Sequence, residues 1–171
     1  GLAGKGAVLQ ELLAYPLSQL ENETQVWALL AWMLQLRGAQ INRFLKQWKT
    51  SNELIRHVTA TVRVLSMLDS TGADRIILFE AGANNVANAV RVAQILGHDA
   101  QGWLDTYQTL QIKSPKELAV TGKDLIANQI ITPGPQMGRI LNSLKAMVIN
   151  DQLPNQPEAL FTAARKLGKD D

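Results

Sequence analysis

The 171-residue sequence contains no cysteine, which excludes a disulfide framework, a cysteine-ligated zinc site and a thiol nucleophile. Aromatic residues make up only 5% of the chain. Its longest nearly unbroken apolar run, residues 26–36, is about half of the roughly 20 residues that span a bilayer, so it predicts a buried helix. No basic, cleavable leader opens the chain. These absences lead us to expect a cytoplasmic protein with no membrane partner.

An excess of charge of one sign is also missing, because 17 basic residues and 15 acidic residues leave a net charge of +2. So small a charge does not by itself indicate a nucleic-acid partner. The charges are unevenly spread, however: residues 37–63 carry six basic residues and one acidic residue, and residues 111–171 carry eight basic and six acidic residues. These two segments are where the chain can present a basic face to phosphate, although solvated helix faces commonly carry charges at this density.

Signatures of phosphate-transfer chemistry are missing as well. The sequence has no G-x-x-x-x-G-K-[ST] loop, no G-x-G-x-x-G after a strand and no Asp-x-Asp pair that could hold two Mg²⁺ ions. The glycine-rich residues 1–6 are expected to be a truncated or flexible start. With only two histidines, no serine or threonine has a base to activate it. We predict no catalytic residue in this chain.

One metal site is worth weighing as an alternative. A His-Asp metal phosphohydrolase would need imidazole and carboxylate ligands, and the candidates are His57, His98, Asp99 and either Asp105 or Asp124. However, Gly97 is typical of a helix end and Asp99 of the N-cap of the next helix. The His-Asp dipeptide is therefore explained as a turn, and we predict no metal ligand.

What the chain does contain is a helical hydrophobic period along nearly its whole length. Asn22 with Gln25 predicts a capping box that opens an apolar helix. The spacing of Ile41, Phe44 and Leu45 predicts a second helix whose apolar stripe Trp48 closes as a core residue. An alternative is that Trp48, which lies between two lysines, stacks nucleic-acid bases. The core interpretation is favoured.

The next helix is predicted to begin with a capping box over residues 50–53. Arg56 and Arg63 are seven residues apart and fall on the face opposite its apolar stripe, where we expect them to meet only solvent or a ligand. Three further helices are expected over residues 73–80, 83–96 and 99–110. A change of composition at residues 111–115 then indicates a linker. The fold class is predicted to be all-α: a helical bundle body, residues 1–110, followed by a smaller helical tail, residues 111–171.

The tail has dense helix-start signals. Thr121 or Gly122 is expected to cap a short helix, and Asn155-Gln156-Pro157-Glu158 is expected to be a third capping box. A helix that begins at Pro135 would point unpaired N–H groups outward. The best phosphate candidates are therefore the amides at this helix start and the nearby cations: Gly134, Gln136, Arg139, Lys145 and Lys123.

Three tail stretches carry a resemblance to a known family: LAVTGKDLI at residues 118–126, ITPGPQMGRIL at residues 131–141, and residues 153–160 with Leu-Pro-Asn at their start. They resemble the C-terminal region of bacterial CCA-adding enzymes, the tRNA nucleotidyltransferases of the poly(A)-polymerase-like class. Residues 25–30 and 44–52 resemble the body region of that family more loosely. The resemblance covers most of the chain and is strongest over residues 113–167.

The resemblance implies an all-helical body and tail that hold the elbow and acceptor arm of tRNA. In the family, an N-terminal head adds C, C and A from CTP and ATP with Mg²⁺. Neither the paired metal-binding aspartates of that head nor the Glu-Asp-x-x-Arg motif of the neck occurs in this sequence. We therefore expect a fragment that is inactive alone, has no cofactor of its own and has the missing head and neck as a partner.

Two functions follow as hypotheses. In the first, the chain binds tRNA phosphates through Arg56, Arg63, Lys123, Gly134, Gln136, Arg139 and Lys145. In the second, the chain is a structural helical module that docks against a head or forms a homodimer, and its charges are merely solvated.

Overall fold

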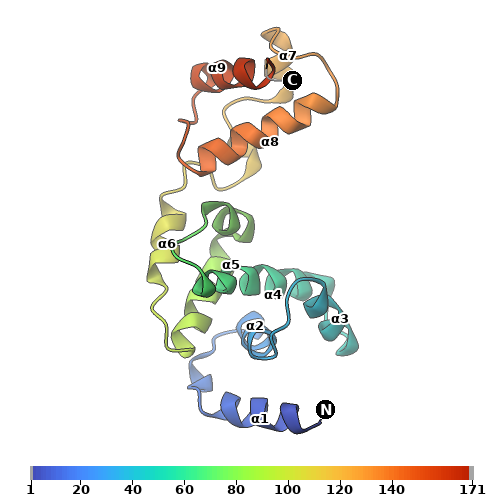
Figure 1. Cartoon of the computed structure of the whole chain (residues 1–171), viewed down its shortest axis with the longest axis vertical. Helices are drawn as coiled ribbons and strands as arrows, with labels where there is room; N and C mark the ends of the chain where they lie inside the picture. Colours follow the sequence, from blue (N-terminus) through green and yellow to red (C-terminus); the bar gives the residue numbers. More distant parts are fainter. Residues whose placement is uncertain (1, 170–171) are drawn as a thin grey trace. The chain divides into compact units, whose positions relative to one another are not determined.

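The computed structural model describes residues 2–169, and every regular element within them is a helix (Figure 1). The predicted all-α fold class is confirmed. The α-helices are α1 (Leu2–Leu13), α2 (Glu23–Met33), α3 (Ala39–Gln47), α4 (Asn52–Leu65), α5 (Arg75–Ile95), α6 (Gln101–Gln108), α7 (Gly122–Ala127), α8 (Pro135–Ile149) and α9 (Pro157–Leu167). Short 3-10 helices η1 (Leu17–Gln19), η2 (Ser66–Asp69) and η3 (Pro115–Glu117) lie between them.

The chain divides into two compact units, Gly1–Gln108 and Thr109–Asp171. Helices α1 to α6 belong to the first unit, and helices α7 to α9 belong to the second. Within residues 2–169, none of these helices is both long enough and apolar enough to cross a bilayer. Gly4 and Gly6 lie inside helix α1, so the expectation of a flexible start is wrong for the residues that the structure describes.

The first unit is built around α4, which packs against α5 and α2 (Figure 1). The predicted apolar stripe of α4 is buried, with Val58, Val62 and Leu65 at most 1% exposed. The N-cap is one residue later than predicted, because the Ser51 side chain accepts a hydrogen bond of 3.1 Å from the Leu54 N–H. For α2 the predicted cap is confirmed, since Asn22 accepts a hydrogen bond from the Gln25 N–H at 3.0 Å.

Helix α5 shows why a glycine breaks a long apolar segment. The sequence predicts two helices separated at Gly82, and the structure has one element that is kinked there. Gly82 has φ 79° and ψ 165°, a backbone conformation that other residues rarely adopt. Asp74 opens the element by accepting hydrogen bonds from the N–H groups of Ile76 and Ile77.

The second unit buries one side of each of its helices, with Leu125, Leu144 and Leu160 fully buried. Its loops are joined by the Asn155 side chain, which accepts a hydrogen bond from the Ala119 N–H and donates one to the Glu117 carbonyl, both at 2.8 Å. The predicted third capping box is therefore wrong. Gln156, and not Asn155, is the N-cap of α9, and it makes no side-chain cap hydrogen bond.

Helices α7 and α8 approach each other at a glycine. A Cβ atom added at Gly122 would lie only 2.5 Å from the Met137 sulfur, whereas a Cβ at Gly138 would meet nothing within 4 Å. We expect Gly122→Ala to lower the free energy of unfolding by about 1 kcal/mol through overpacking. Gly138→Ala is expected to raise it by about 0.5–1 kcal/mol through helix propensity. Urea denaturation of both variants tests this pair, and equal effects of the same sign would contradict it.

Candidate RNA-binding surface

In the first unit, Arg56 has the accessibility that a phosphate contact needs. It is exposed on α4, and among residues 2–169 no carboxylate oxygen lies within 4 Å of its guanidinium. Its neighbour His57 turns instead toward the helix pair, where Nδ1 lies 3.2 Å from Asn85 Oδ1. Arg56 can therefore give its full charge to a ligand.

Arg63 is placed differently from the prediction. Its guanidinium pairs with the Glu80 carboxylate of α5, so the expectation that it meets only solvent or a ligand is wrong. Both partners are about half exposed, and exposed ion pairs contribute little to stability. The α4 stripe correctly puts Arg63 on the outer face. Glu80 lies 17 residues further along the chain, on another helix, and the periodicity of α4 alone could not predict that it reaches Arg63.

In the second unit, the predicted residues fall on two neighbouring places. Lys145 lines a hollow of about 280 Å³ that it shares with Thr121 and Gly122 at the start of α7. Lys116, which no sequence pattern singles out, lines the same hollow from the short helix η3. It directly follows the expected linker, residues 111–115, and lies outside every predicted helix. Two lysines beside one hollow give this part of the unit a local positive charge.

The second place is the start of α8. Gly134 is the N-cap of this helix and is exposed, Gln136 is half-buried in its first turn, and Arg139 is exposed one turn further on. The close contact of Gly122 with Met137 brings the start of α7 next to this turn. Exposed Lys123 follows Gly122 directly. The structure thus gathers the predicted tail residues around the junction of α7 and α8.

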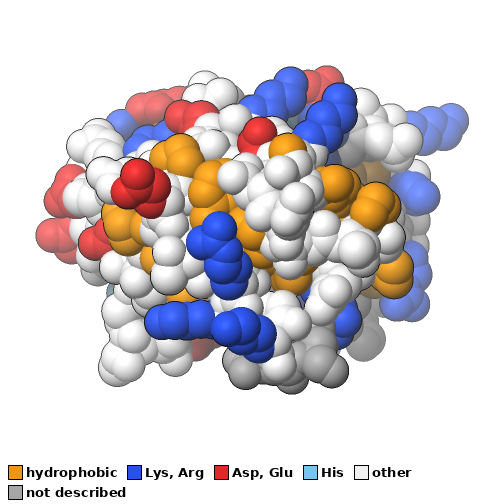
Figure 2. Space-filling view, turned by 90° about the horizontal axis from the view of Figure 1, so that it is seen from above, with side chains coloured by type: hydrophobic (Ala, Val, Ile, Leu, Met, Phe, Trp, Pro, Cys, Tyr) orange, Lys and Arg blue, Asp and Glu red, His pale blue; other side chains and the backbone are white. Residues whose placement is uncertain are grey.

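Cationic side chains on this unit lie beside apolar ones. Figure 2 looks at the molecule from the side on which α7 and α9 are drawn in Figure 1, and it shows hydrophobic side chains exposed in the middle of the face with Lys and Arg side chains next to them. Lys and Arg cover apolar surface with their stems while their charged heads reach solvent or a ligand.

The start of α7 is stabilised by a complete capping box. Asp124 accepts hydrogen bonds from the Thr121 N–H at 2.7 Å and from the Thr121 hydroxyl at 2.9 Å, and these bonds lower the pKa of the Asp124 carboxyl. In the preceding loop, the N–H groups of Lys113 and Ser114 donate to Glu117 and lower the pKa of its carboxyl. The Gly-Lys-Asp motif therefore has a structural reason for its Asp: it fixes the helix that presents Lys123.

These two lowered pKa values predict how acid affects the second unit. A carboxyl whose pKa is lower in the folded state adds stability above its unfolded pKa, and that stability is lost as the pH falls through the folded pKa. The usual values are 4.5 for Glu117 and 3.8 for Asp124. We expect Glu117→Gln and Asp124→Asn to lower the free energy of unfolding at pH 7. The difference from the parent should shrink as the pH falls below these values. Urea titrations at several pH values measure it, and a difference that does not vary with pH would contradict the assignment.

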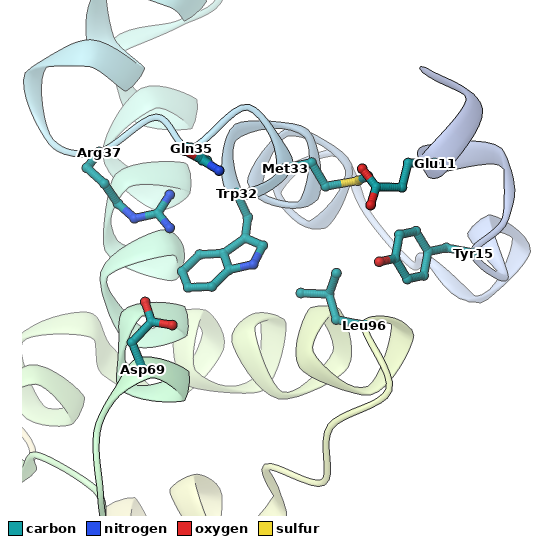
Figure 3. Close-up of a pocket in the computed structure, with 8 residues that line it drawn as sticks. All are labelled: Glu11, Tyr15, Trp32, Met33, Gln35, Arg37, Asp69 and Leu96. Carbon is teal, nitrogen blue, oxygen red and sulfur yellow. The ribbon is translucent and has the colours of Figure 1, made fainter. Parts of the chain in front are cut away.

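The first unit also has an open pocket of about 560 Å³ (Figure 3). The Arg37 guanidinium lies 4.1 Å from the centroid of the Trp32 ring, a cation–π geometry. Figure 3 shows Asp69 on the Arg37 side of Trp32, and Glu11 with Tyr15 beyond Met33. The two carboxylates on the pocket wall, Glu11 and Asp69, would repel an anionic ligand. The pocket is therefore a poor phosphate site.

The metal alternative has no support in the arrangement of the titratable residues. Among residues 2–169, no group of three or more His, Asp and Glu side chains could hold a metal ion. Asp99 accepts a hydrogen bond from the Gln101 N–H at 3.1 Å, which is the turn interaction that its sequence context predicts.

The fold and this surface define the chain as an all-α protein of two helical units with exposed cations on each unit. Residues 18–164 match the family of tRNA nucleotidyltransferase domain 2, and the chain belongs to that family.

Individual relatives agree with the family match. The chain is 55% identical over 171 residues to the CCA-adding enzyme of Pediococcus pentosaceus, covering 100% of this chain and 43% of that enzyme. It is 39% identical over 168 residues to the CCA-adding enzyme of Lactiplantibacillus plantarum, covering 96% and 41%. The crystal structure of the Bacillus stearothermophilus CCA-adding enzyme in complex with CTP aligns with a TM-score of 0.80 at 26% identity, over 99% of this chain and 44% of that one.

The chain therefore spans about two fifths of the length of these curated relatives. The resemblance to CCA-adding enzymes that the sequence motifs indicate is confirmed.

Proposed function

We propose that this chain is the tRNA-binding body and tail of a CCA-adding tRNA nucleotidyltransferase. It holds the elbow and acceptor arm of tRNA so that the 3′ end reaches a catalytic head, to which CTP, ATP and Mg²⁺ bind. The observation that carries the proposal is the 55% identity to a CCA-adding enzyme over all 171 residues. The head chemistry belongs to another part of the enzyme, and this chain supplies binding and orientation.

The charge pattern supports a backbone contact rather than base readout. Phosphate contacts from Arg and Lys position a protein on a nucleic acid without reading its sequence. An enzyme that must act on every tRNA needs recognition of this kind, by shape and phosphate. Exposed Arg56 on the first unit, and exposed Lys123 and Arg139 on the second, are suited to it.

The residues contribute unequally. Arg63 must share its guanidinium between Glu80 and a phosphate, so it is a weaker contact than Arg56. Gly134 and Gln136 lie at the start of α8, and the dipole at a helix N-terminus attracts a phosphate. Lys145, together with Lys116, attracts the RNA backbone to the hollow beside α7.

A structural module that self-associates is the second candidate function. It is favoured by an apolar hollow of about 460 Å³ between α8 and α9, lined by Met147, Leu153 and Leu167 among others. Hydrophobic surface of this kind can bind a second copy of the chain. Sedimentation of the chain with and without tRNA separates the two functions, because a module would dimerise without RNA and would not bind it.

Chemical footprinting of tRNA with the purified chain tests the tRNA-positioning proposal. We expect protection of the ribose-phosphate backbone at the elbow and along the acceptor arm, with the anticodon arm unprotected. Protection spread evenly over the whole tRNA, or none, would contradict the proposed positioning role.

A further inference from the structure

Trp48 belongs to a group of three rings, which we name the aromatic cluster: the exposed Trp48 and the half-buried Trp27 and Phe44. The ring centroids are 6.2 Å apart for Trp27 and Trp48, 6.4 Å for Phe44 and Trp48, and 6.3 Å for Trp27 and Phe44. Trp48 is nevertheless 62% exposed, so the prediction that it is a core residue is wrong. The two other rings hold its orientation while most of its surface stays open.

The backbone that carries Trp48 is also well fixed. The Trp48 N–H donates to the Leu45 carbonyl at 3.0 Å, and the Lys49 N–H donates to the Lys46 carbonyl at 3.1 Å. The Thr50 hydroxyl donates to the Leu45 carbonyl at 3.0 Å, and Lys49 has φ 55°, which turns the chain sharply toward α4. An aromatic side chain held in this way pays little entropy when a ligand stacks on it.

The surroundings of the aromatic cluster are cationic. Arg43, Lys46 and Lys49 are exposed, and within residues 2–169 no carboxylate oxygen lies within 4 Å of their charged nitrogens. On α2, Glu23 accepts a hydrogen bond of 3.3 Å from the Trp27 indole N–H. The apolar surface of a protein partner would provide no negative charge to pair with these three cations. A flat ring joined to phosphates, as in a nucleotide, matches both the indole and the charges.

We propose that Trp48 stacks an unpaired base of the bound RNA, while Arg43, Lys46 and Lys49 bind the adjoining phosphates. The inference rests on the proposed function, because it adds a single-stranded contact to the same RNA. Stacking tolerates any base, since every base has a π-face, so the contact is compatible with recognition of all tRNAs. It is a contact of the first unit, whereas the hollow beside α7 belongs to the second unit.

The test compares tRNA affinity for the parent chain, Trp48→Ala and Trp48→Phe at two salt concentrations. Trp48→Ala should weaken binding by about 5- to 150-fold, the range for one stacked base, with an unchanged salt slope because no charge is lost. Trp48→Phe should retain most of the affinity. Replacing Lys46 and Lys49 by alanine together should instead lower the slope by somewhat under about two units. Leu13→Ala, which removes another exposed apolar side chain, 76% exposed, is the matched control and should change neither quantity.

A second probe does not depend on how Trp48→Ala folds. Binding of a ten-nucleotide oligoadenylate should quench part of the tryptophan emission of the parent chain, and that part should be missing in Trp48→Phe. Equal quenching in the parent chain and in Trp48→Phe would overturn the stacking proposal. Parent-like tRNA affinity of a Trp48→Ala chain with an unchanged melting temperature would overturn it too. Neither result would contradict the proposed tRNA-binding function. A parent chain that binds no tRNA would overturn the proposed function and this inference together.

Discussion

Replacing Arg56, Lys123 and Lys145 by alanine together is expected to weaken tRNA binding by about a hundredfold at 0.1 M salt. In the described part of the chain, no carboxylate oxygen lies within 4 Å of the charged nitrogens of these three side chains, so their charge is available to phosphate. Each phosphate that a protein neutralises releases counterions and adds about 0.7–0.9 to the slope of log K against log salt concentration. Three lost contacts should make that slope shallower by about 2 to 2.7 units.

The matched control removes the same charge from another helix end. Arg165, Lys166 and Lys169 are exposed in and after α9, and their joint replacement by alanine also lowers the net charge by three. We expect it to leave the salt slope nearly unchanged. Equal losses of slope in both triple variants would mean that total charge, and not the particular cations of α4, α7 and α8, governs binding. All six replacements are at exposed or half-buried positions, so thermal melting should shift little.

Asn155→Ala is expected to lower the free energy of unfolding by about 1–3 kcal/mol. The side chain makes two hydrogen bonds of 2.8 Å to the backbone of Ala119 and Glu117, and the Asn155 N–H donates to the Gln111 side chain at 2.9 Å. Each lost hydrogen bond costs about 0.5–1.5 kcal/mol, and more where its partner is left unsatisfied. The Leu-Pro-Asn motif thus joins the loop before α7 to the loop before α9.

Gln156→Ala is the control for Asn155→Ala. Gln156 is the next residue, is exposed and makes no side-chain cap hydrogen bond, so its replacement should change the free energy of unfolding by less than about 0.5 kcal/mol. Urea denaturation followed by circular dichroism measures both variants. If the two cost the same, Asn155 does not have the joining role that its hydrogen bonds indicate.

Local patterns predicted much of the fold because helix signals act over a few residues. Asn22 caps α2, Thr121 caps α7, and Gly82 interrupts α5 where the sequence indicates a helix break. The same signals failed where a distant partner competes. Asn155 looks like a helix cap, yet it bonds to residues 36 and 38 positions earlier in the chain.

The candidate surface was predictable in part for the same reason. Periodicity placed Arg56 and Arg63 on the outer face of α4, but it could not show that Glu80 from α5 reaches Arg63. Trp48 ends the apolar stripe of α3, which suggests burial, but it is 62% exposed. What covers a residue is a tertiary property, and one helix's pattern does not contain it.

The most direct test of the account is a filter-binding titration of tRNA with the parent chain at two salt concentrations. We predict saturable binding that weakens steeply as salt rises, with little difference between tRNAs of different sequence, because the contacts are mainly to phosphate. No saturable binding at low salt, or binding whose affinity does not depend on salt, would contradict the claim that this chain holds tRNA through its exposed cations.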